Sequence, residues 1–143
     1  MAEPGRVVAL WVSPRRGQPM ELRSAVRARE NYGLEGCAHA RPNGARQVLL
    51  IDSETLEEFG VPPGALKENL TTQGLEVPSL PPGTRLQVGG VLLEVAKECR
   101  PCREVNHVQP GLLERIAGRR GQLARVLAGG EIQVGDPIIT LSF

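Results

Sequence analysis

The chain has 143 residues, of which 41% are hydrophobic, and this length fits one folded domain with its own core. We therefore expect residues 1–143 to form a single domain that needs neither a disulfide nor a metal for stability. The 17 basic and 16 acidic side chains give a net charge of +1, which argues against broad electrostatic binding of nucleic acid or a membrane. No apolar run is long enough to span a membrane, and the N-terminus lacks the pattern of a signal peptide. These features predict a cytoplasmic protein and leave its oligomeric state open.

The counts of individual residue types exclude further functional classes. The chain has 17 glycines and 12 prolines, so turns are frequent, but only one Trp, one Tyr and two Phe. A groove for single-stranded nucleic acid needs aromatic faces on which bases stack, and so few aromatic residues argue against one. Three cysteines cannot all pair with one another, and cytosolic thiols stay reduced. Each cysteine is therefore a core residue, a metal ligand or a reactive thiol.

The first half of the chain predicts strands and one helix. Residues 6–13 form a β-branched run that ends at Ser-Pro, and residues 20–29 contain one or two extended pieces. Residues 46–51 predict a mostly buried strand. A short helix follows, because Asp52 or Ser53 can cap its free amides and Gly60 can end it.

The second half continues the same pattern of short strands. Residues 85–95 predict a hairpin whose turn is Gly89-Gly90, since glycine accepts the positive φ of a tight turn. Residues 111–118 have apolar positions at helical spacing, and residues 122–141 contain further strands and turns. This pattern predicts a mainly β fold, a closed or nearly closed β-barrel of short strands with two or three short helices.

Cys102 is the first candidate functional residue. It follows a predicted strand, next to Pro101 and between Arg100 and Arg103, in a loop at the rim of the fold. Nearby cations, Lys97 among them, favour the thiolate, which is the reactive form of cysteine. The alternative is a buried and inert cysteine, which is less compatible with a charged loop.

Other candidates are polar residues in three separate segments. His39 follows a glycine-rich turn at residues 33–36, which can direct a side chain toward a cavity, although a structural hydrogen-bonded histidine is the alternative. Asn69 belongs to the polar segment 67–74. Arg46 precedes a buried strand, where its guanidinium could bind an anion or remain a solvated surface group. The pairs Arg15-Arg16 and Arg119-Arg120, and also His107, are expected to be solvated surface residues, and Trp11 to pack in the core or at its rim.

Together these segments resemble a MOSC domain, the domain found at the C-terminus of molybdenum cofactor sulfurases. The resemblance runs from about residue 7 to residue 141, with the motifs in the order of the family. The motifs are Gly33-Leu34-Glu35-Gly36, Ala38-His39, Arg46, Glu68-Asn69-Leu70 with Gly74, Gly89, Pro101-Cys102 and Gly135-Asp136.

The resemblance implies a β-barrel and one characteristic cysteine, here Cys102, that carries sulfur as a persulfide or binds the molybdenum of the pterin cofactor (molybdopterin). Arg46, Arg100 and Arg103 would bind its phosphate and pterin oxygens, and Asn69 and His39 would orient it by hydrogen bonds. The partners implied are a sulfur donor such as a cysteine desulfurase, or a molybdoenzyme or reductase. Pyridoxal phosphate belongs to a separate domain of the larger sulfurases, so none is expected here.

Two cysteines depart from the family pattern. Cys37 stands where the family usually has an acidic residue, and Cys99 is an addition to the usual motif. Cys37, His39, Cys99 and Cys102 form C-x-H and C-x-x-C, a set that could bind zinc if the two loops converge. Alternatively, Cys99 could act as a resolving thiol that forms a disulfide with Cys102.

Two further functions remain open at this point. Some MOSC relatives reduce N-hydroxylated substrates with molybdenum bound at the cysteine. The chain has no pattern for an iron–sulfur, flavin or nicotinamide site, so such an enzyme would need a separate electron donor. The other alternative is a zinc-stabilised barrel without catalysis, which would unfold when the metal is removed.

Overall fold

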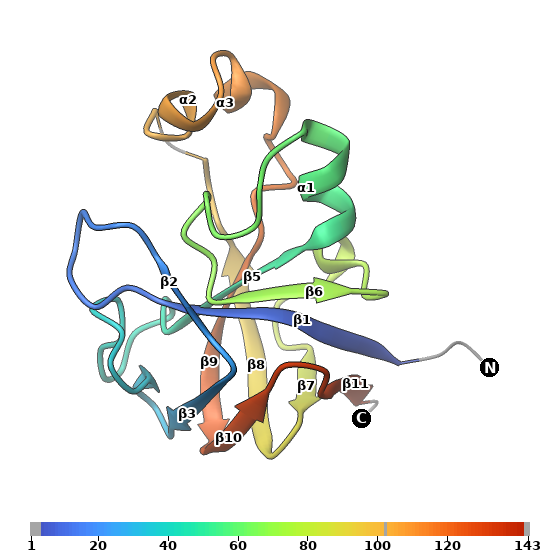
Figure 1. Ribbon diagram of the computed structural model, residues 1–143. Coiled ribbons are helices and arrows are strands. Elements are labelled where there is room, and N and C mark those ends of the chain that lie inside the picture. The colour runs from blue at the N-terminus through green and yellow to red at the C-terminus, as the bar shows by residue number, and fades with distance from the viewer. Residues whose placement is uncertain (1–3, 102, 142–143) are drawn as a thin grey trace.

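The protein is a closed β-barrel with three short helices at one end (Figure 1). The computed structural model describes residues 4–101 and 103–141. Seven strands pair in the order β11-β7-β8-β9-β5-β6-β1, and the pairing of β1 with β11 closes the barrel. These strands are β1 (Gly5–Val12), β5 (Val48–Asp52), β6 (Leu70–Gln73), β7 (Arg85–Val88), β8 (Val91–Glu98), β9 (Gln122–Ala128) and β11 (Pro137–Leu141). The predicted mainly β barrel is confirmed.

The remaining strands extend or flank the barrel. β2 (Glu21–Arg23) pairs with the outer part of β1, and β10 (Gly130–Gln133), β3 (Ala25–Arg29) and β4 (Gly33–Leu34) form a second, three-stranded sheet. All strand pairs in the described residues are antiparallel except β5 with β6. A parallel pair cannot be joined by a tight turn, so the chain makes a long crossover between these two strands. That crossover contains α1 (Ser53–Phe59) and the loop of residues 60–69.

The hairpin predicted at residues 85–95 is present as β7 and β8. Gly89 in its turn has φ +54°, and a Cβ at this position would lie 2.2 Å from the Asp136 carboxylate. This turn therefore needs glycine for both backbone conformation and space.

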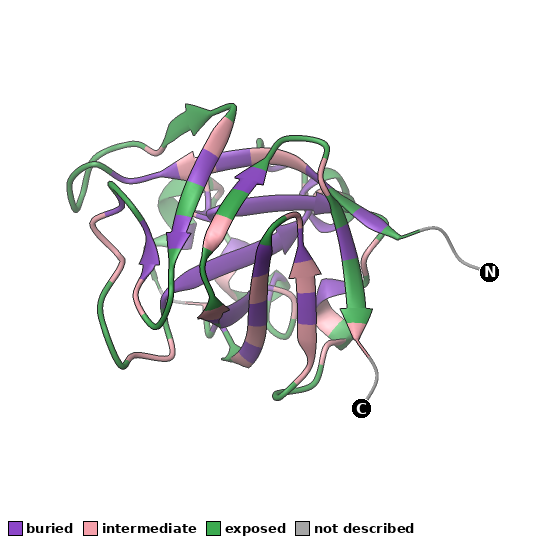
Figure 2. Ribbon diagram, turned by 90° about the horizontal axis from the view of Figure 1, so that it is seen from below, coloured by how far each residue is buried: buried purple, intermediate pink, exposed green. Residues whose placement is uncertain are grey.

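Apolar side chains form two separate cores. The first fills the barrel with alternate residues of the strands, which Figure 2 shows as buried bands along them. The second lies between the outer face of β5 and β9 and the helices α1 (Ser53–Phe59), α2 (Val105–Val108) and α3 (Leu112–Arg115). It includes Ile51, Leu56, Val105, Leu112, Ile116 and Leu123. This second core joins the three helices to the barrel.

The predicted helix after residue 52 is confirmed as α1. Asp52 is its N-cap, and Gly60 ends it in a left-handed conformation with φ 66°. The helix predicted over residues 111–118 is shorter than expected, covering only Leu112–Arg115. A short 3-10 helix, η1 (Val77–Ser79), follows β6. None of the helices in the described part of the chain has the length and apolarity needed to cross a membrane.

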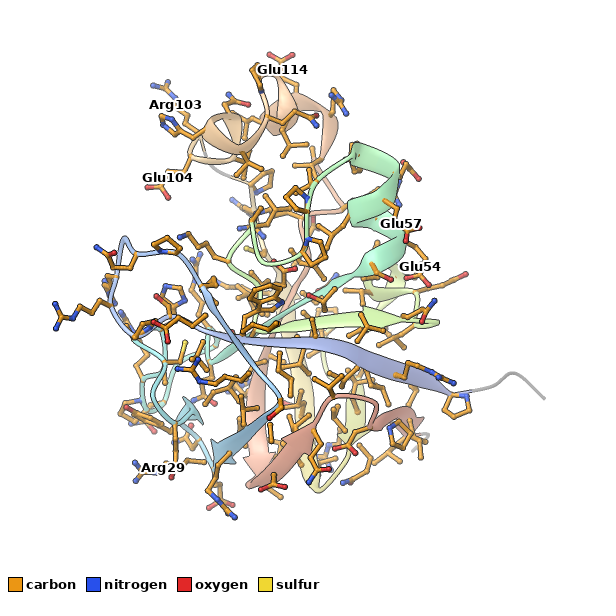
Figure 3. The ribbon with its side chains drawn as sticks, in the orientation of Figure 1. Arg29, Glu54, Glu57, Arg103, Glu104 and Glu114 are labelled. Atoms are coloured by element: carbon orange, nitrogen blue, oxygen red, sulfur yellow. The ribbon has the colours of Figure 1, made fainter. Side chains whose placement is uncertain are left out.

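We expect Asp52→Ala to destabilise the protein by about 1–2 kcal/mol, because the N-cap of α1 is lost. The Asp52 carboxylate is buried and accepts hydrogen bonds from the Thr55 backbone N–H (3.2 Å) and the Thr55 hydroxyl (2.8 Å). The matched control is Glu57→Ala on the same helix, since Glu57 is exposed and projects away from the barrel (Figure 3). Urea unfolding at neutral pH measures both variants. Equal stability of the two would contradict the assigned cap.

Candidate functional site

The segment around Cys102 leaves the end of β8 and leads into α2. Cys102 itself lies outside the described residues, so its predicted role is not tested by the structure. Arg100 and Arg103 are exposed, and Pro101 is half-buried. Arg103 and Glu104 project away from the barrel at the start of α2 (Figure 3). The two arginines flanking Cys102 are therefore in contact with solvent.

A cleft with a volume of about 480 Å³ lies directly beside this segment. One wall is the loop before β6, and the other is α2 with its N-cap residue Glu104. The lining residues are Gly17, Ala65, Leu66, Lys67, Glu104, Val105, His107, Val108 and Arg120. Because Glu104 follows Cys102 by two positions, the cleft and the cysteine segment belong to one region of the fold.

Arg120 is buried in the lining of this cleft, with 7% of its surface exposed. The expectation that Arg119-Arg120 is a solvated pair is therefore wrong for Arg120. Its Nη2 donates a hydrogen bond to the Leu66 carbonyl (2.6 Å), whereas its Nε and Nη1 have no partner among residues 4–101 and 103–141. An incompletely paired guanidinium is costly to bury, so this residue is unusual for one with only a structural role.

The loop before β6, which forms one wall of the cleft, is held in place by a chain of buried hydrogen bonds. The Glu68 carboxylate is fully buried and accepts hydrogen bonds from the Gly64 N–H and from the Thr71 hydroxyl, both at 2.9 Å. The Trp11 indole donates to the same Thr71 hydroxyl (3.0 Å). The Trp11 ring also packs against Gly64, where a Cβ would lie only 3.0 Å from ring atoms. This network fixes the position of the loop on β1.

Asn69 lies inside the protein rather than in the lining of the cleft. Its Oδ1 accepts from the Leu49 N–H (3.0 Å), and its Nδ2 donates to the Trp11 carbonyl (3.2 Å) and to the Cys37 sulfur (3.5 Å). These contacts use the hydrogen-bonding capacity of the amide within the protein. Its predicted contact with a cofactor remains a prediction, and the contacts in the structure join β1 to β5.

Cys37 and His39 lie together in the turn after β4, next to Asn69. Cys37 is buried at the barrel core, and His39 is half-buried. Burial raises the pKa of the Cys37 thiol. Hydrogen bonds from the His39 side chain, from the backbone of Ser13 and His39, and from Asn69 outweigh this effect and lower the pKa to about 7. At neutral pH this thiol is therefore substantially ionised.

The proposed zinc ligands lie in different parts of the fold. Cys37 belongs to the core of the barrel, whereas Cys99 is buried in the core beneath the helices, and its N–H donates to the Gly121 carbonyl (2.9 Å). Within residues 4–101 and 103–141, no group of three or more His, Cys, Asp or Glu side chains is placed to bind a metal ion. The zinc set and the disulfide both include Cys102 and remain predictions.

The last predicted cofactor ligand, Arg46, is exposed in the loop before β5 and does not line the cleft.

The residues that sequence reasoning missed are Arg120, Glu68 and Lys67. In the sequence, Glu68 was noted only as part of the motif Glu68-Asn69-Leu70, without a role of its own. No pattern of residues next to Arg120 predicts that its side chain is buried. The hydrogen-bond partner of Arg120, the Leu66 carbonyl, is 54 positions away in the sequence.

The family model for the MOSC domain matches residues 27–139 of this chain. The chain belongs to the MOSC domain family. This match covers most of the second sheet, most of the barrel, the cysteine segment and the cleft lining except Gly17. The family is generally linked to the molybdenum cofactor. A search of curated proteins finds no match.

Solved structures share the fold of this MOSC domain over nearly its whole length. The YuaD protein from Bacillus subtilis matches with a TM-score of 0.87 and 20% identity, over 97% of this chain and 96% of that chain. YiiM from Geobacillus stearothermophilus has a TM-score of 0.77 and 23% identity, over 97% and 76% of the two chains. YiiM from Escherichia coli has a TM-score of 0.69 and 23% identity, over 100% and 71%.

We expect the Cys37 thiol to titrate near pH 7, and His39→Ala to raise this pKa because a hydrogen bond to the thiolate is lost. Thiolate absorbance in metal-free buffer, measured in a Cys99→Ala, Cys102→Ala background, reports this ionisation. A Cys37 pKa that stays near 9.0 in the folded protein would contradict the arrangement.

The same ionisation makes stability depend on pH. The pKa of Cys37 is lower in the folded protein than its ordinary value of 9.0, so between pH 7 and 9 the unfolded chain binds more protons. The stabilisation is therefore present above pH 9 and is lost as the pH falls through about 7. Urea unfolding measured between pH 7 and 9 should show that the free energy of unfolding rises with pH. In Cys37→Ser this rise should be smaller.

Proposed function

We propose that this MOSC domain is a molybdenum-cofactor-associated sulfur carrier that holds sulfur as a persulfide on Cys102. The observation that supports the proposal most strongly is the cleft beside the Cys102 segment, with a buried and incompletely paired cation in its lining. A reactive thiol next to a cleft prepared for an anionic group is the combination that such a carrier needs.

The residues present fit an anionic cofactor. Arg120 lines the cleft and has buried N–H groups without a partner among the described residues, and Lys67 and His107 also line it. Arg120 and Lys67 would hold the phosphate of the cofactor, and the exposed Arg100 and Arg103 would contact it from the cysteine segment. When bound, the molybdenum cofactor supplies a metal centre that accepts soft sulfur ligands such as a thiolate.

The sulfur-loading step requires no external oxidant. The Cys102 thiolate attacks the terminal sulfur of a persulfide on a donor protein such as a cysteine desulfurase. A new S–S bond forms at Cys102 as the S–S bond of the donor breaks, and the donor sulfur leaves as a thiolate. The terminal sulfur is thereby transferred, with its proton, and Cys102 becomes the persulfide.

The charges near Cys102 favour this step. Arg100 and Arg103 are one or two positions away in the sequence and carry permanent positive charges. Positive charge stabilises a thiolate more than a thiol, so both arginines lower the energy of the attacking species. Their exposure also leaves the segment accessible to a partner protein.

We expect the wild-type chain, incubated with a cysteine desulfurase and cysteine, to gain about 32 Da from one sulfur atom. Intact-mass spectrometry without reductant measures this adduct, and peptide mapping locates it. Cys102→Ser should abolish it, whereas the matched controls Cys37→Ser and Cys99→Ser should retain it.

Two results would overturn the proposal. The first is an adduct of the same yield in Cys102→Ser, which would show that another thiol accepts the sulfur. The second is one zinc ion per chain that is lost in Cys37→Ser or Cys99→Ser, together with unfolding when a chelator removes it. That result would identify a metal-stabilised barrel.

A further inference from the structure

We propose that Arg120 is the anchor of an oxyanion-binding site in this cleft, and that its ligand is a phosphate group of the kind found in phosphate monoesters. The inference deepens the proposed function and rests on it only for the source of the phosphate, which is either the pterin cofactor or free phosphate. The binding chemistry itself follows from the side chains in the described residues.

The first argument is the unused donor capacity of Arg120. A guanidinium has five N–H donors, of which one belongs to Nε and two to Nη1. These two atoms are shielded from solvent, and in the part of the chain that the structure describes they have no hydrogen-bond partner. A buried cation with several unpaired donors is unfavourable in the free protein and becomes favourable when an anion with several acceptor oxygens binds.

The second argument is the fixed orientation of the guanidinium. Its Nη2 is held by the Leu66 carbonyl at 2.6 Å, and Leu66 belongs to the loop that forms the wall of the cleft. The hydrogen bonds of Glu68 with Gly64 and Thr71 hold the same loop in place. Arg120 is therefore ordered before the ligand binds, which lowers the entropic cost of binding.

The third argument is the charge of the surrounding lining. Lys67 lines the cleft, and its ammonium donates to the Gln18 carbonyl (2.9 Å), which holds it at the edge of the site. His107 adds further donor capacity, and Glu104 is the acidic residue of the lining. Two permanent cations against one carboxylate favour a doubly charged oxyanion over a neutral ligand.

The test compares Arg120→Met with Arg119→Met, a matched control one position earlier. Arg119 donates to the Glu58 carboxylate and to the Thr55 hydroxyl, and it lines a different cleft with Asp52 and Glu54. Inorganic phosphate and glycerol phosphate are the two probes. Dissociation constants are measured by calorimetry and by the shift of the Arg120 Nε–H resonance, with chloride as the competing anion.

We expect both probes to bind the wild-type protein and to shift the Arg120 resonance. Arg120→Met should weaken binding by at least about tenfold, because charge-assisted hydrogen bonds are lost. Arg119→Met should change it less than about twofold, because surface charges at a distance contribute little. If glycerol phosphate binds more tightly than inorganic phosphate, the phosphate group bound in the cleft belongs to the cofactor. If inorganic phosphate binds more tightly, the natural ligand is free phosphate.

Thermal unfolding without phosphate provides the second readout. If Arg120 is retained for binding, Arg120→Met should keep or raise the unfolding midpoint, because an unpaired buried charge is replaced by an apolar side chain. A large fall of the midpoint, combined with a wild-type protein that binds neither probe, would overturn the proposal and make Arg120 a structural residue. Cys102→Ser should still bind phosphate. A failure of the sulfur-carrier proposal, seen as absent sulfur loading, can therefore be distinguished from a failure of the phosphate-site proposal, seen as absent phosphate binding.

Discussion

The arrangement of the site depends on the way Asn69 joins two strands that are not neighbours in the barrel sheet. Its backbone N–H donates to the Leu49 carbonyl (2.9 Å), its carbonyl accepts from the Trp11 N–H (2.8 Å), and its side chain adds a bond to each of the same two residues. Asn69 immediately precedes β6, which lies between β1 and β5. It therefore fixes the end of the loop that carries Leu66 and Lys67. With that end fixed, the Leu66 carbonyl is in place to orient Arg120, and the wall of the cleft is set before any ligand arrives.

The region around the cleft combines two chemical properties. One is a pair of exposed arginines, Arg100 and Arg103, on either side of Cys102 in the sequence, and the other is the buried Arg120 guanidinium, which lacks partners for two of its nitrogens among the described residues. The first favours a reactive thiolate, and the second favours an anion held away from water. Burial of an incompletely paired charge lowers stability, and its presence beside a cleft is the pattern expected of a residue kept for binding. Cys37 and His39 form a separate thiol–imidazole pair next to Asn69.

Local signals in the sequence predicted the elements that depend on local interactions. Asp52 and Gly60 marked the two ends of α1, and Gly89-Gly90 marked the hairpin turn, because caps and turns are satisfied by nearby residues. The strand β6 was missed because Thr71, Thr72 and Gln73 look like a polar loop until their barrel neighbours are known. Arg120 was misjudged for the same reason, since its hydrogen-bond partner, the Leu66 carbonyl, is far away in the sequence. The ordered motifs identified the family and drew attention to Cys102, whereas the orientation of Asn69 into the protein followed only from the tertiary structure.

If Arg120 binds the phosphate of the cofactor and Cys102 supplies a soft sulfur ligand to its metal, both residues serve one bound cofactor. The most direct measurement is the molybdenum and pterin content of the protein purified from cells that make the cofactor, determined by elemental analysis and by fluorescence of the released pterin. Wild-type protein and Arg119→Met should contain bound cofactor, whereas Arg120→Met and Cys102→Ser should each lose most of it while remaining folded. Full cofactor content in folded Arg120→Met would contradict the claim, because the cofactor would then bind outside this cleft.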